Sequence, residues 1–332
     1  YIENFFIFVE LKSRFVMRKL YAIVCLALLS NAYKAQESLP YYQQYLLDGE
    51  FLFNPAQYGK TDYVQLNLNY QQQFSKFSES PNVQSVGINA NIFDRVGAGI
   101  SAFRDSNGPI SANGVTVGGS YFIPLSSEGD RKDQFSFGTS VNFYNMNFDY
   151  SKINTEDGFD PLLQGNESNI FMVYANFGLA ATYRGLFGGV SVNDIALSND
   201  ESIVNNVEPS PIKFFLNLGY DWKIADNIAI TPSALINLNT NSTRLLDLNL
   251  MATFSNDINA FSFGASFRGV QNRFDNQQLS ISPIVKVRFN KFMIGATYNL
   301  GMSDIQEYGG NSFMIGLGYN FDNFINHRGF RY

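Results

Sequence analysis

The chain has 332 residues, of which 45% are hydrophobic and only 16% charged, and its formal net charge is −6. One Cys and one His exclude a disulfide scaffold and argue against a zinc site or a His-based triad, and 29 acidic residues against 23 basic ones disfavour nucleic-acid binding. The 32 Phe and 19 Tyr are too many for a disordered chain.

The first element in chain order is a predicted secretory signal peptide at residues 17–35. Met17 opens a short basic start, Tyr21–Leu29 is an apolar run, and Ser30–Ala32 has the small-x-small form of a cleavage site. The alternative is that the apolar run belongs to a core helix. Residues 1–16 are expected to be upstream residues that are not part of the true protein.

Residues 36–60 carry no strand pattern. Tyr41–Phe53 is expected to form one or two helical turns, and Pro55 restricts Asn54 so that the chain turns before the first strand. Two interpretations stay open for this N-terminal periplasmic or plug segment. It is either a plug or docking element, or a lead-in strap that covers the end of the following domain.

From residue 61 to residue 321 apolar residues alternate with polar or small ones, as in Val64–Gln71 and Phe313–Phe321. Such a period of two indicates strands with one apolar face. Most segments have ten residues or more, longer than an average soluble strand and close to the roughly nine to eleven that cross a bilayer. The fourteen segments are roughly 62–74, 81–93, 95–104, 113–124, 133–149, 169–183, 185–193, 213–224, 227–240, 243–256, 259–270, 278–290, 291–300 and 311–321.

The connections between these segments alternate in length. They are tight after most even-numbered segments, except at Leu125–Lys132, and longer and polar after most odd-numbered ones, including the third, except at Thr240–Ser242. The longest are about 150–168 and 194–212. Short turns at one end and long loops at the other are typical of outer-membrane barrels.

The predicted fold is therefore an all-β, 14-stranded antiparallel transmembrane β-barrel at 61–321, with short periplasmic turns and long extracellular loops. Closure leaves every backbone group paired in hydrocarbon. The apolar stripe then faces lipid, a stripe of amides, hydroxyls and glycines faces the lumen, and residues 322–332 form a periplasmic tail. Pro232 and Pro283 fall within strands and are expected to break the ladder locally. A secreted β-sandwich or propeller is the alternative architecture.

The residues show no persuasive active site, so no catalytic, cofactor-binding or metal-binding residue is predicted and an enzyme is not expected. The acidic run Glu156–Asp160 lacks the spacing of a calcium loop. No glycine-rich phosphate loop joins a strand to a helix.

Several stretches in order resemble the PorP/SprF family of outer-membrane proteins from the type IX secretion and gliding-motility systems of Bacteroidota. No single stretch is as specific as a metal-ligand pattern, but together they span nearly the whole chain after the signal peptide. Phe74 stands where the family more often has Trp. The stretches are Tyr42–Tyr45, Phe53–Ala56 with Gly59, Tyr70–Phe74, Val96–Ile100 with Asp105, Gly108 and Pro109, Leu218–Tyr220, Asp226–Asn227, Ile230–Ser233, Gly309–Ser312 and Gly318–Phe321.

The resemblance implies a non-enzymatic secretion accessory that binds or anchors a secreted cell-surface adhesin through the adhesin's C-terminal region, together with other type IX components. It supplies no site residues, and the partner-binding residues stay unknown. Contacts are expected on the loops 150–168 and 194–212 or within the lumen. The alternative is a passive outer-membrane pore or uptake channel for small or apolar solutes, with the N-terminal segment as its plug.

Overall fold

The computed structural model describes residues 43–76, 79–125, 133–149, 152, 168–198, 211–240, 244–256, 258–271, 276–302 and 310–326. Residues 1–16, the predicted signal peptide, most of the loops expected at 150–168 and 194–212, and tail residues 327–332 lie outside this part. Among the residues it covers, no helix is long and apolar enough to cross a membrane.

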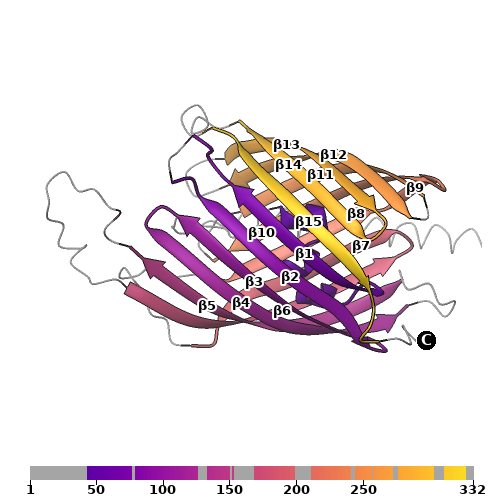
Figure 1. Cartoon of the computed structure of the whole chain (residues 1–332), viewed down its shortest axis with the longest axis horizontal. Helices are drawn as coiled ribbons and strands as arrows, with labels where there is room; N and C mark the ends of the chain where they lie inside the picture. The colour runs from indigo at the N-terminus through magenta and orange to yellow at the C-terminus, as the bar shows by residue number, and fades with distance from the viewer. Residues whose placement is uncertain are drawn as a thin grey trace, which may run out of the picture. The chain divides into compact units, whose positions relative to one another are not determined.

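Long antiparallel strands form a single sheet (Figure 1). β8 and β9 are separated only by Asp221 and both pair with β10, so together they make the predicted strand 213–224. Counting them as one confirms the prediction of fourteen strands. The strands are β1 (Tyr63–Gln72), β2 (Asn82–Phe93), β3 (Val96–Asn107), β4 (Ile110–Pro124), β5 (Gln134–Phe148), β6 (Ser168–Tyr183), β7 (Leu186–Ala196), β8 (Lys213–Tyr220), β9 (Trp222–Ala225), β10 (Ile228–Asn239), β11 (Arg244–Ser255), β12 (Asn259–Gln271), β13 (Asn276–Phe289), β14 (Phe292–Gly301) and β15 (Ser312–Asp322).

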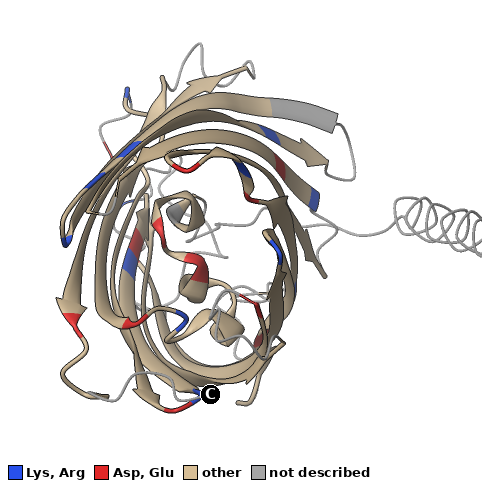
Figure 2. Cartoon of the chain, turned by 90° about the vertical axis from the view of Figure 1, so that its right-hand side faces the viewer, with Lys and Arg blue, Asp and Glu red and all other residues tan. Residues whose placement is uncertain are grey.

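The sheet closes on itself because its first and last strands pair. The β1–β15 ladder runs from Tyr63↔Asp322 to Gln72↔Phe313, and β10 and β11 are also paired. The end-on view shows the strands surrounding a central space (Figure 2). A closed barrel has no open sheet edge, which is the condition for a β-structure to lie in hydrocarbon.

The two faces of the wall carry the two predicted kinds of side chain. Leu68 on β1 is 43% exposed, whereas its neighbours Asn67 and Asn69 are 2% and 7% exposed. Leu216 and Ile315 are likewise exposed, at 47% and 44%. The apolar stripe therefore points away from the lumen, as expected for residues that face lipid.

The connections match the predicted asymmetry at both ends of the barrel except after β3. Five of the six turns at the β2–β3 end are short, such as Asp94–Arg95 and Arg184–Gly185. At the other end a longer polar loop was predicted after β3, and this prediction was wrong. The pairing of β3 and β4 continues to Asn107↔Ile110. The tight turn between them needs a residue with a positive φ, which Gly108 provides at φ +57°.

Both in-strand prolines interrupt one of their two ladders. The β10 ladder with β11 runs through Pro232, but its ladder with β8 and β9 stops at Ser233 and resumes at Ile230. Pro283 pairs with Ala265 on β12, but the β13–β14 ladder skips it. The expected local breaks are confirmed, because proline has no N–H to donate.

Candidate functional site

The residues that precede β1 lie within the barrel, where the end-on view shows short helical turns inside the ring of strands (Figure 2). We call Gln43–Asp62 the luminal segment. It contains three 3₁₀ turns, η1 (Gln44–Leu47), η2 (Glu50–Leu52) and η3 (Pro55–Gln57). Its apolar side chains are buried, with Leu47 and Ala56 fully inaccessible.

Local sequence explains the turn at η3. Pro55 occupies the first turn position, where its missing N–H leaves no donor unpaired. Asn54 caps the turn, because its side chain accepts a hydrogen bond from Ala56 N at 3.0 Å. Gly59 has φ +64° and lets the chain reverse toward β1.

On the side of the lumen formed by β4 and β5 the luminal segment packs against bare backbone, and Leu47 does the same at β15. A Cβ at Gly118 would lie 2.6 Å from the Tyr58 ring, and one at Gly316 would lie 2.7 Å from Leu47 Cδ1. A Cβ at Gly138 would lie 2.7 Å from Ala56 N. These contacts are closer than real Cβ atoms allow, so a larger side chain at any of these positions would displace the segment.

Hydrogen bonds from inward-facing side chains hold the backbone of the luminal segment. The carbonyl of Phe53 accepts from Ser191 Oγ at 2.8 Å and from Asn193 Nδ2 at 2.7 Å. The carbonyl of Tyr58 accepts from Ser120 Oγ at 2.6 Å. These bonds explain why small polar residues line the inner wall, since an irregular segment buried in a barrel needs partners for its peptide groups.

On the opposite side a buried ion pair meets the segment. Arg268 on β12 donates two hydrogen bonds to Asp247 on β11, Nε to Oδ1 at 2.7 Å and Nη2 to Oδ2 at 2.6 Å. Tyr45 OH donates to the same carboxylate at 2.8 Å. Burial and the negative charge of Asp247 raise the pKa of Tyr45, so this hydroxyl remains a donor at neutral pH.

A second ion pair joins the segment to β13. Lys286 Nζ lies 2.7 Å from Asp48 Oδ1, and both side chains are partly exposed. Burial raises the pKa of Asp48, but the charge of Lys286 and its hydrogen bond outweigh this effect and leave the pKa below its ordinary value. This pair therefore holds the segment with charge at neutral pH.

A cavity of about 1060 Å³ lies between the luminal segment and the wall of β8–β13. Its lining reaches Arg184 and Asp221 next to the short turns, and it includes charges of both signs from Glu50, Lys60 and Lys223. The segment thus leaves a polar space on the side of the lumen where it meets the ion pairs.

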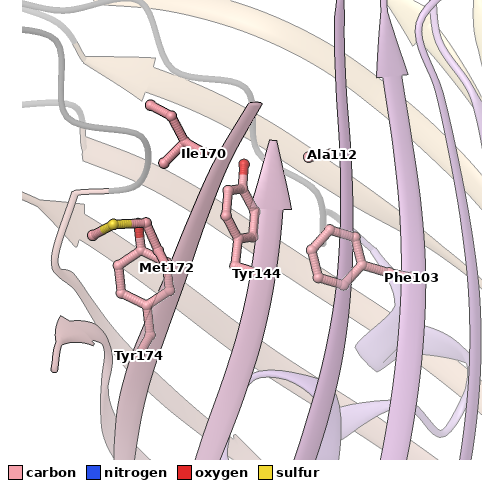
Figure 3. Close-up of a cluster of buried hydrophobic side chains, with 6 residues drawn as sticks. All are labelled: Phe103, Ala112, Tyr144, Ile170, Met172 and Tyr174. Carbon is pink, nitrogen blue, oxygen red and sulfur yellow. The ribbon is translucent and has the colours of Figure 1, made fainter. Parts of the chain in front are cut away.

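At the long-loop end the inner wall of β3–β6 carries an apolar cluster, contrary to the uniformly polar lumen predicted from the alternation. Inward-facing side chains of β3–β6 pack into one buried cluster (Figure 3). The strand pattern missed it because aromatic residues occur on both faces of these strands. The cluster consists of Phe103, Ala112, Tyr144, Ile170, Met172 and Tyr174.

A further buried ion pair lies at this end, between Lys213 at the start of β8 and Asp194 near the end of β7, with Nζ and Oδ2 2.7 Å apart. The loops for which partner contacts were expected, 150–168 and 194–212, lie mostly outside the described residues. Within those residues no group of three or more His, Cys, Asp or Glu side chains is arranged to hold a metal ion.

Comparison with solved structures supports the fold. Two mutants of a monoaromatic hydrocarbon channel, TodX deltaS2S3 and TodX deltaS2, match with TM-scores of 0.52 and 0.50 at 10% identity, covering 82% of this chain and 94% and 93% of theirs. At this identity the likeness shows the barrel fold alone. A comparison with curated proteins gave no match.

The family comparison reaches further than the fold. The model for type IX secretion system membrane protein PorP/SprF matches residues 34–319, which include the luminal segment and nearly the entire barrel. The match covers well over half of the chain and confirms the resemblance read from the sequence. This chain is a non-enzymatic outer-membrane β-barrel that belongs to the PorP/SprF family of the type IX secretion system.

Proposed function

We propose that this barrel binds a secreted cell-surface adhesin, through the adhesin's C-terminal region, and anchors it at the outer membrane as an accessory of type IX secretion. Family membership supports association with the secretion system. The observation that carries the proposal is the occupied lumen, because a segment held by ion pairs and by peptide hydrogen bonds suits a stationary docking barrel better than an open conduit.

We place the docking surface at the long-loop end, which faces the cell exterior in barrels with short periplasmic turns. Beneath that surface the described wall is braced by the buried apolar cluster of β3–β6 and by the Lys213–Asp194 pair. Recognition also falls on the loops 150–168 and 194–212, since loops on a rigid scaffold commonly carry binding residues.

Affinity purification of the tagged full-length chain from native outer membranes tests the proposal. An adhesin is expected to co-purify, and removal of its C-terminal region is expected to abolish its recovery while other type IX components remain. Deletion of the barrel gene is expected to abolish surface display of that adhesin. Unchanged display of every type IX cargo would refute the accessory function.

One observation favours the second candidate, a passive pore for small or apolar solutes. The cavity of about 1060 Å³ beside the luminal segment reaches the short turns, and the fold is shared with channels named for monoaromatic hydrocarbons. Single-channel recording separates the two functions. A docking barrel is expected to be silent and to conduct only after residues 43–58 are deleted, whereas steady currents from the intact chain would favour the pore.

A further inference from the structure

An apolar groove of about 800 Å³ crosses the outer surface of β3–β7. It lies on the face of the wall opposite the luminal segment. Its outward-facing lining is almost entirely aliphatic and aromatic, and no charged residue takes part. The main side chains around it are those of Tyr121, Phe137, Thr139, Phe177, Leu179 and Val190.

The register of the strands explains why the wall is hollow here. Ala98, Gly119 and Thr139 are neighbours in one cross-strand row of outward positions, which Phe177 closes. Below this row the register aligns Val96, Tyr121, Phe137 and Leu179, and above it Ile100, Val117 and Val141. Three small residues between two rows of large ones make a furrow across the strands.

The furrow offers nothing to a polar ligand. The serine and threonine hydroxyls of its lining already have acceptors: Thr139 Oγ1 donates to the carbonyl of Asn176 at 3.1 Å, and Ser120 Oγ and Ser191 Oγ donate toward the lumen, to the carbonyls of Tyr58 and Phe53. The peptide groups of its floor pair along the β4–β5 and β5–β6 ladders. An occupant must therefore be a hydrocarbon, because burial of a polar group without a partner is unfavourable.

The groove cannot close by repacking from the inside. Gly118 and Gly138 face the lumen immediately beside its floor, and the positions their Cβ atoms would take are held by Tyr58 and Ala56 of the luminal segment. The wall here is bare backbone with the segment behind it. The glycines behind the floor have no side chain that could fill it, so the furrow is preformed on a surface that faces lipid.

The position of the groove along the strands indicates which membrane leaflet supplies the hydrocarbon. Gly119 and Tyr121 precede the end of β4 at Pro124, and Phe137 and Thr139 follow the start of β5 at Gln134. These ends lie at the periplasmic side of the barrel, where turns are short. Lipids in contact with this height belong to the periplasmic leaflet.

We propose that the groove is a binding site for one acyl chain of a periplasmic-leaflet phospholipid, which lies over Gly119 and Thr139 and is held by the aromatic and aliphatic side chains beside them. The rings of Tyr121 and Phe137, tilted by 34° with centroids 5.6 Å apart, form one side of the site. A chain that fills the furrow gains dispersion contacts with a fixed wall that the neighbouring lipid tails lack. Such a chain exchanges more slowly than the surrounding lipid.

Native mass spectrometry of the full-length chain in delipidating detergent tests this proposal. The wild type is expected to retain one phospholipid, and Thr139→Phe, which fills the furrow, is expected to reduce the retained fraction at least tenfold. Thr139→Val keeps the space and is expected to retain the lipid. Ala296→Phe adds the same ring at an exposed, outward position on β14 and is also expected to retain it.

Heat-modified mobility in gels confirms that each variant is folded, and Gly119→Leu is a second filling variant if Thr139→Phe fails to fold. Equal retention by the wild type and by both filling variants would overturn the proposal. Equal loss from Ala296→Phe would show a non-specific lipid annulus and would also overturn it, as would retention of lipid A in place of a phospholipid.

Discussion

The two sides of the lumen hold the luminal segment by different physical means. The wall of β4 and β5 offers glycines whose missing side chains leave room for Tyr58 and Ala56. The wall of β11–β13 instead offers charged groups, the Asp247–Arg268 pair and Lys286. Close packing positions the segment on the first side, and electrostatic attraction holds it on the second.

This difference predicts different sensitivities. A close-packed contact is insensitive to pH and salt, but it does not tolerate added volume because the packed atoms have no room to move. An ion pair tolerates small changes of volume, but it depends on the protonation state of its groups and on both partners being present. Four changes test the comparison, in decreasing order of expected effect.

Asp247→Ala is expected to have the largest effect, a loss of about 3–5 kcal/mol in the free energy of unfolding, because it removes the carboxylate from the buried Arg268 guanidinium. Urea titration of the barrel in lipid vesicles measures it. The double variant Asp247→Leu with Arg268→Met removes both charges and is expected to recover most of the loss. If the double variant is no more stable than Asp247→Ala, the loss does not come from the unpaired charge.

Gly138→Leu is expected to follow, with a loss of about 1–3 kcal/mol from overpacking. The added side chain meets Pro55 and Ala56, so the luminal segment should leave its site and become cleavable by added protease. Gly119→Ala, one strand away but facing outward, is the matched control and should leave the segment protected. Equal protease protection in Gly138→Leu and the wild type would count against the close-packed contact.

Tyr45→Phe is expected to lose about 1–2 kcal/mol, the typical net contribution of one or two hydrogen bonds. The ring still packs near Phe53, with centroids 5.9 Å apart, but the hydroxyl's bond to Asp247 and the longer one from Asn249 Nδ2 at 3.2 Å are lost. A double-mutant cycle with Asp247→Asn isolates the coupling. Additive effects of the two substitutions would show that hydroxyl and carboxylate do not interact.

Acidification is expected to have the smallest effect, below about 1 kcal/mol, because the Asp48–Lys286 pair is partly exposed to solvent and screened. The pKa of Asp48 lies below its ordinary value. The stabilisation is thus complete above the unfolded pKa of about 3.9 and is lost as the pH falls through the lower folded value. Hydrogen exchange of residues 43–58 measures it, and Asp48→Asn should remove this dependence.

The sequence alone determined the barrel. Fourteen strands, their boundaries to within a few residues, the outward position of Leu216 and Ile315, and the breaks at Pro232 and Pro283 follow from a period of two and from the missing N–H of proline, both of which are local. The tight turn after β3 escaped prediction because polar residues such as Asn107 extend the ladder as readily as they form a loop.

Only the tertiary structure decided what the interior contains. Neither the partnership of Tyr45 with Asp247, 202 positions apart in the sequence, nor the fit of Leu47 against Gly295 and Gly316 leaves a local pattern. Nothing local in the sequence shows that several of the inward-facing glycines leave space for another segment. The physical reason is that alternation records which face a side chain occupies, whereas a contact across the lumen depends on which distant strands the closed sheet places opposite each other.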